Sequence, residues 1–188
     1  MKTKISTAML TRLALMTAAS MVLLLLVRIP FPPAPFLVYD PADMPIYITA
    51  FAFGPVAGLL VTVVVSLLQA FALGGDGLYG FLMHVVATGI VAVVIGAMYG
   101  RKKTKKQAVK ALIVGTITTV VVMCGMNLLI TPLYMGVPTK AVLAMIPTVI
   151  IPFNALKAGI NSLLTFLLYK KISGFLHQDT LQIKKNKK

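Results

Sequence analysis

Long apolar runs, separated by short polar or proline-rich segments, make up most of the chain. Several runs approach the roughly 20 residues that an α-helix needs to cross a bilayer core of about 30 Å. The pattern predicts an all-α membrane protein, a compact bundle of six transmembrane helices at about residues 8–28, 46–53, 55–72, 79–99, 108–131 and 147–171. We expect one transmembrane domain over residues 1–171 and a basic, disordered tail over 172–188.

The count of six helices depends on a break at Phe53-Gly54-Pro55. Proline has no amide N–H and disfavours helical backbone at the residue before it, so the run from 46 to 72 divides into a short helix and a full span. A helix of about ten residues rises only about 15 Å, half of the bilayer core. Prolines and glycines predict three loops, from residue 29 to Met44, at Gly74–Gly77 and from Pro132 to Ile146.

The basic residues favour the same count. With six helices, the amino terminus, residues 101–110 and the carboxyl tail share one side, and they hold every Lys and Arg except Arg28, Lys140 and Lys157. With five helices, the later basic clusters would lie opposite the amino terminus, against the positive-inside rule. We therefore predict that both termini are cytoplasmic. This placement accounts for the net charge of +14 without a nucleic-acid partner.

One charged residue lies where a membrane helix tolerates it least. Lys157 falls well inside the last span, in the run IIPFNALKAGINSLLTFLLY, and a lysine at the centre of a span costs roughly 2.5–3.5 kcal/mol. All four acids of the chain fall in predicted loops or in the tail, so the span offers no obvious ion-pair partner. We interpret Lys157 as a functional residue that faces a cavity, rather than one that extends to the membrane surface.

Four other polar residues within the spans divide between binding and structural roles. Asn154 is three residues before Lys157, on the same helix face, and Asn127 also lies in the outward half of its span. We predict that these three residues line one outward cavity. Asn161 lies deeper and is interpreted as a hydrogen-bonded link between helices, and His84 as a packing histidine rather than a metal ligand.

Two smaller features carry candidate roles outside that cluster. In the first loop, Asp43 is expected to be the N-cap of the short helix, whereas Asp40 is a candidate for contact with a polar ligand. Ala14 and Ala18 form a small-residue face on the first helix, which lets another helix approach closely. Taken alone, such a face is usually explained by packing within the bundle.

The motifs of enzyme chemistry are missing from the sequence. It has no G-x-x-x-x-G-K-[ST] phosphate loop, no H-E-x-x-H pair, no G-x-S-x-G elbow and no acidic residue in a predicted span. We therefore predict no enzyme activity, no metal site and no resident cofactor. The remaining function is binding in a polar pocket, with another subunit supplying the energy for transport.

Three segments, in this order, resemble the substrate-binding S components of energy-coupling factor (ECF) vitamin transporters, most closely the riboflavin-specific ones. They are VRIPFPPAPFLVYDPADMP after the first helix, VVMCGMNLLITPLY in the fifth and VIIPFNALKAGI in the sixth. The resemblance covers nearly the whole chain. It implies a riboflavin-binding component of an ABC importer in the bacterial cytoplasmic membrane, with a transmembrane coupling subunit and two cytoplasmic ATPases as partners.

The resemblance also implies residue roles. Asn127, Asn154 and Lys157 would contact the flavin, as the transported ligand, and the loop from Leu37 to Asp43 would close over it, with Asp40 near the ribityl hydroxyls. Because riboflavin is uncharged, Lys157 would act as a hydrogen-bond donor rather than as a counter-ion. The pair Ala14-x-x-x-Ala18 would dock against the coupling subunit.

Two alternatives stay open on the sequence alone. The same scaffold could serve another vitamin, such as folate, thiamine or pantothenate, because only the pocket would differ. The polar residues could also link the helices of a structural membrane protein that binds nothing. Ligand affinity and its dependence on Lys157 separate these possibilities.

Overall fold

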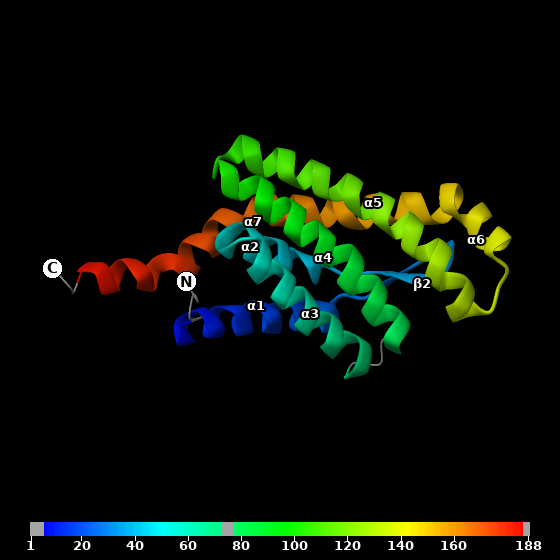
Figure 1. Ribbon diagram of the computed structural model, residues 1–188, viewed down its shortest axis with the longest axis horizontal. Helices are drawn as coiled ribbons and strands as arrows, with labels where there is room; N and C mark the ends of the chain where they lie inside the picture. The colour runs from blue at the N-terminus through cyan, green and yellow to red at the C-terminus, as the bar shows by residue number, and fades with distance from the viewer. Residues whose placement is uncertain (1–5, 73–76, 186–188) are drawn as a thin grey trace.

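The computed structural model describes residues 6–72 and 77–185, with side chains as far as residue 174. The chain is almost entirely helical, with one small β-hairpin (Figure 1). Its elements are α1 Thr7–Leu26, β1 Ile29–Phe31, β2 Ala34–Tyr39, α2 Asp43–Phe53, α3 Pro55–Phe71, α4 Gly77–Arg101, α5 Lys105–Met135, α6 Thr139–Met145 and α7 Ile151–Lys185, with a π-helical turn at Ile146–Ile150. The predicted long spans all appear as helices.

The predicted break between the second and third helices is confirmed. Gly54 has a φ of 93°, in the region that favours glycine, and Pro55 is the first residue of α3. The short helix α2 is buried at every residue from Asp43 to Ala52 and packs against α1, α3, α4 and α7. It is therefore the central element of the bundle, and its apolar residues need no contact with lipid.

The prediction of a loop from Pro132 to Ile146 is wrong, because most of this segment is helical. Helix α5 continues through Pro132 to Met135 and ends at Gly136, which has the left-handed φ of 67° that commonly terminates helices. Helix α6 and the π-helical turn then lead into α7. Membrane helices tolerate an internal proline because neighbouring groups can satisfy the freed carbonyl.

Two further segments differ from expectation, and one lies outside the described residues. The loop after α1 contains the antiparallel hairpin of β1 and β2, in which Ile29 pairs with Tyr39. Helix α7 continues to Lys185, where we predicted a disordered tail from residue 172. Residues 74–76 of the predicted glycine turn are not described, and α4 begins at Gly77.

The basic segments gather at one end of the long axis. Figure 1 shows the start of α1, the end of α7 and the turn between α4 and α5 at this end, with the β-hairpin and α6 at the opposite end. Within the described residues, four helical segments are long and apolar enough to cross a membrane: α1, α4, α5 and the segment Thr139–Gly174. The apolar helix α3 is shorter.

The apolar core lies mainly toward the basic end. Phe51 of α2 stacks on Tyr99 of α4 with ring centroids 4.3 Å apart, and Tyr169 of α7 meets both rings edge-on. Such edge and offset contacts are the arrangements that aromatic rings prefer. The cluster joins three helices at the end of the bundle away from the hairpin.

Candidate functional site

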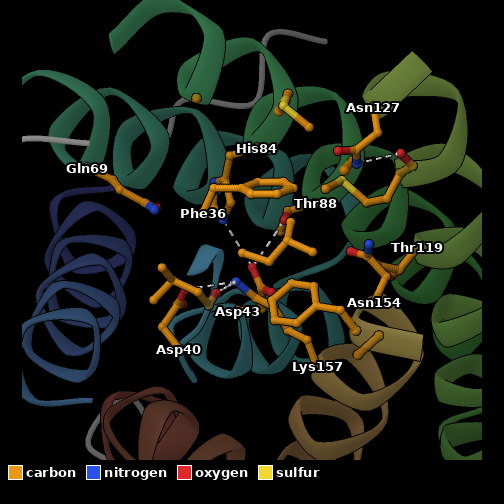
Figure 2. A pocket seen from close by; sticks show the side chains of 18 of the residues that line it. Phe36, Asp40, Asp43, Gln69, His84, Thr88, Thr119, Asn127, Asn154 and Lys157 are labelled. Atoms are coloured by element: carbon orange, nitrogen blue, oxygen red, sulfur yellow. Dashed lines mark hydrogen bonds and ion pairs between the residues drawn. The ribbon is translucent and has the colours of Figure 1, made fainter. Parts of the chain in front are cut away.

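A cavity of about 320 Å³ lies at the hairpin end of the bundle. Its wall includes residues from α1, β2, α2, α3, α4, α5 and α7, and Figure 2 shows many of their side chains converging. All six residues proposed from the sequence to contact a ligand line this cavity: Leu37, Asp40, Asp43, Asn127, Asn154 and Lys157. A volume of this size, with mixed apolar and polar walls, is typical of small-molecule sites.

Lys157 has the acidic partner that its own helix does not provide. Its Nζ lies 2.8 Å from Oδ2 of Asp40 and 3.4 Å from the carbonyl oxygen of Val38, so it links α7 to β2 and to the residue that follows β2. The lysine side chain is 19% exposed and that of Asp40 6% exposed. Because an ammonium group has three N–H donors, one donor is left over after these two contacts.

Asp43, in the wall of the cavity, links three elements. It is the first residue of α2, and the N-cap is Ala42 without a side-chain hydrogen bond, so the predicted capping role of Asp43 is wrong. Its Oδ1 lies 3.1 Å from both Nε2 of His84 and the hydroxyl of Thr88, and its Oδ2 accepts from Asn161 at 3.2 Å. The carboxylate is engaged by other helices because it points into the bundle rather than back along its own backbone.

His84 and Asn161 both have hydrogen-bond partners on other elements. Nδ1 of His84 lies 2.6 Å from the hydroxyl of Ser66 on α3, while its other nitrogen contacts Asp43. Asn161 donates to the carbonyl oxygen of Asp40 at 3.2 Å and to Asp43, and its amide oxygen accepts from the hydroxyl of Tyr39 at 3.3 Å. The interpretation of Asn161 as a link between elements is confirmed.

Tyr39 donates to this network from the hairpin. Burial and, next, the negative charge of Asp40 raise the pKa of its phenol above the ordinary value. The hydroxyl therefore stays protonated and serves as the donor to Asn161.

Asn127 and Asn154 differ from Asn161, because the hydrogen bonds of their side chains stay local: those of Asn127 lie within α5, and that of Asn154 reaches the π-helical turn just before α7. The amide of Asn127 donates to the Met123 carbonyl at 2.8 Å and accepts from Thr131 at 2.8 Å. The amide of Asn154 donates to the Ile150 carbonyl at 2.8 Å. Both residues are almost fully buried, yet neither is used to join helices by these bonds. Each amide keeps hydrogen-bonding capacity that a ligand can use.

Apolar residues supply much of the rest of the wall. Phe36, Leu37 and Val38 of β2 lie along one side, and Leu37 packs with Phe153 of α7 in a small buried cluster. The first loop thus folds over the cavity as a hairpin. Strand pairing was not predicted, because the prolines of this segment obscure the alternation that marks a strand.

Several wall residues were missed by the sequence analysis: Gln69, Thr88, Thr119 and Thr131. Thr and Gln within apolar runs are common and carry no spacing signal of their own. Only the position of Thr131, four residues after Asn127, could have singled it out.

The small-residue face lies elsewhere. Ala14 and Ala18 are exposed on α1 and do not line the cavity. Internal packing therefore does not explain these two alanines within the described chain.

The fold and cavity define a small helical membrane protein built to hold a ligand between its helices. A family model described as "ECF transporter, substrate-specific component" matches residues 8–169. The chain belongs to this family and is a multi-pass membrane protein with a role in transport.

Two relatives support the assignment. Over 154 residues, the chain is 33% identical to the riboflavin transporter RibU of Staphylococcus aureus (strain TCH60), covering 79% of this chain and 80% of that protein. It also matches a solved structure of the S component of a bacterial ECF transporter, with a TM-score of 0.75 and 28% identity. That match covers 90% of this chain and 97% of the other.

Proposed function

We propose that this chain is the riboflavin-binding S component of an ECF-type importer, which takes up the vitamin across the bacterial cytoplasmic membrane. The observation that carries the proposal is the convergence of Asn127, Asn154 and Lys157 on one cavity that the hairpin covers. The relative named as a riboflavin transporter supports the choice of ligand.

The chemistry of the cavity suits a flavin. The isoalloxazine ring is flat and mostly apolar, with carbonyls and ring nitrogens at one edge, so it needs an apolar slot and a few convergent donors. Phe36, Leu37 and Phe153 provide apolar surface, and the amides of Asn127 and Asn154 provide donors or acceptors. Because Asp40 already balances the charge of Lys157, the remaining donor of Lys157 suits an uncharged ligand.

The proposal extends to topology and partners. Six helices cross the membrane, with α2 held inside the bundle, and both termini and the α4–α5 turn are cytoplasmic, as the positive-inside rule favours. The exposed pair Ala14 and Ala18 docks on a transmembrane coupling subunit, and two cytoplasmic ATPases supply the energy. The hairpin segment from Leu37 to Asp43 closes the outer side of the pocket.

Titration of riboflavin with the detergent-purified protein tests the function. The chain has no Trp, so quenching of the vitamin's own fluorescence reports binding. We expect saturable quenching by the wild type and a loss of about 1–3 kcal/mol in binding free energy for Lys157→Ala, the cost of unpaired buried polar groups.

Other results would contradict the proposal. Folded, ligand-free wild-type protein that does not quench riboflavin would point to another vitamin, and folate, thiamine and pantothenate can then be tested by calorimetry. Wild-type affinity in folded Lys157→Ala would remove Lys157 from the binding site.

A further inference from the structure

Gln69 of α3 is the wall residue whose hydrogen bonding is incomplete. Three side-chain polar atoms of the described residues are buried without a hydrogen-bond partner: Ser20 Oγ, Gln69 Oε1 and Tyr169 Oη. Of these three, only Gln69 lines the cavity. A buried acceptor without a partner is unfavourable, so a rotation of the Gln69 amide that gives this oxygen a donor is favourable.

Three other polar residues of the wall are already engaged in hydrogen bonds. Both oxygens of Asp43 accept hydrogen bonds, both ring nitrogens of His84 have partners, and Asp40 accepts from Lys157 and from the Ala42 amide. Gln69 differs from these three residues, because its amide oxygen has no such contact within the described chain.

The position of Gln69 separates it from the two asparagines. Figure 2 shows its side chain extending into the cavity from the side of α3, with Asn127 and Asn154 on the opposite side and Asp40 and Lys157 between. A ligand that reaches both sides must be elongated and carry polar groups at both ends. Riboflavin has this form, with the ring edge at one end and the ribityl chain at the other.

We propose that Gln69 is a specificity-determining residue that hydrogen-bonds the ribityl hydroxyls, while the ring lies toward Asn127 and Asn154. Hydroxyl groups suit this position, because one hydroxyl can accept from Nε2 and, once the amide turns toward the ligand, another can donate to Oε1. The inference rests on the proposed riboflavin function and adds the orientation of the ligand and the recognition of its sugar-alcohol chain.

A comparison of riboflavin with lumiflavin tests the assignment, because lumiflavin has the same ring with a methyl group in place of the ribityl chain. The experiment titrates each flavin by its fluorescence with wild type and Gln69→Met, a variant of similar size without the amide. We expect riboflavin to bind the variant about tenfold more weakly, and lumiflavin to change less than about twofold.

Gln107→Met is the matched control. Its amide donates to the Met98 carbonyl at 2.9 Å near the α4–α5 turn, and it does not line the cavity. We expect this control to lower the melting temperature of the ligand-free protein and to bind both flavins normally. Gln69→Met should leave the melting temperature unchanged or raise it, because it removes an unpaired buried acceptor.

Three results would overturn the assignment, and they are distinguishable. Unchanged riboflavin binding by Gln69→Met, or equal weakening of both flavins, would exclude selective recognition of the ribityl chain while leaving the riboflavin function intact. Wild-type protein that binds neither flavin would contradict the proposed function, and the role of Gln69 with it.

Discussion

The two ends of the bundle are built on different principles. At the basic end, α2, α4 and α7 meet through stacked aromatic rings, among them Phe51, Tyr99 and Tyr169. At the hairpin end, the same three helices are joined by Asp43, His84, Thr88 and Asn161 around a cavity. Apolar packing is tight and non-directional, whereas hydrogen bonds fix side chains at defined positions beside an open space.

This difference separates two kinds of polar residue. Asp43 and Asn161 bond to other elements at the hairpin end. Asn127 and Asn154 line the cavity without such bonds between elements, and Gln69 lines it with an unpaired amide oxygen. The first kind should govern stability, and the second kind should govern ligand affinity. Substitutions at the two ends can break or sharpen this distinction.

The largest effect is expected for Asp43→Leu. The substitution removes the shared acceptor of His84, Thr88 and Asn161 and leaves buried donors without partners. We expect a loss of about 3–5 kcal/mol in folding free energy, measured as a large fall in melting temperature in one detergent. Asp43→Asn keeps one acceptor oxygen and should lose less. Equal stability of wild type and Asp43→Leu would show that the network does not support the fold.

Asn161→Leu and Asn154→Leu form a matched pair on α7. Asn161→Leu should cost about 2–3 kcal/mol in stability, because it leaves the Asp43 carboxylate and the Asp40 carbonyl without this donor. Asn154→Leu should change stability little, since the hydrogen bond of its side chain stays local, and should weaken riboflavin binding by about 1 kcal/mol. Melting curves and flavin titrations of both variants check the pair, and a reversed pattern would contradict the division of roles.

At the packed end, Gly96→Ala tests how closely α4 approaches the break before α3. A Cβ at Gly96 would lie 2.9 Å from the backbone N and Cα of Pro55, so we expect a loss of about 1–3 kcal/mol in stability. Gly100, one turn later on the same helix, has open space where a methyl group would lie, so Gly100→Ala should be neutral or slightly stabilising. Comparable melting temperatures for the two variants would argue against the close approach.

The smallest effect on the isolated protein is expected at the exposed face of α1. Ala14→Leu and Ala18→Leu should leave stability and riboflavin binding unchanged, because both positions are exposed and away from the cavity. They should abolish uptake of labelled riboflavin by cells that contain the coupling module, because added bulk prevents close helix approach. Normal uptake would exclude this face as the docking surface.

The sequence predicted the elements that depend on local pattern. Apolar length predicted the long helices, and the Gly54-Pro55 pair predicted the separate short helix, because both signals act within a few residues. The helix end predicted at Pro132 was wrong, since the surrounding structure allows the helix to continue to Met135. The hairpin was missed because its prolines interrupt the expected alternation.

The hydrogen-bond partners of the cavity residues were harder to predict from the sequence than which residues line the cavity. Lys157, Asn127 and Asn154 were predicted to share one cavity from helical spacing and depth, and they do line the same cavity. The pairing of Lys157 with Asp40 joins residues 117 positions apart, so no local rule could indicate it. No sequence pattern indicated Gln69 either, because its proposed role depends on an amide oxygen that lacks a hydrogen-bond partner in the folded structure.

The central claim is that riboflavin lies in the cavity at the hairpin end. An experimental structure of the protein purified with riboflavin tests it most directly. We expect the isoalloxazine ring within hydrogen-bonding distance of Asn127, Asn154 and Lys157, beneath the hairpin, with the ribityl chain at Gln69. Riboflavin bound outside this cavity, or a cavity that stays empty at saturating riboflavin, would contradict the account.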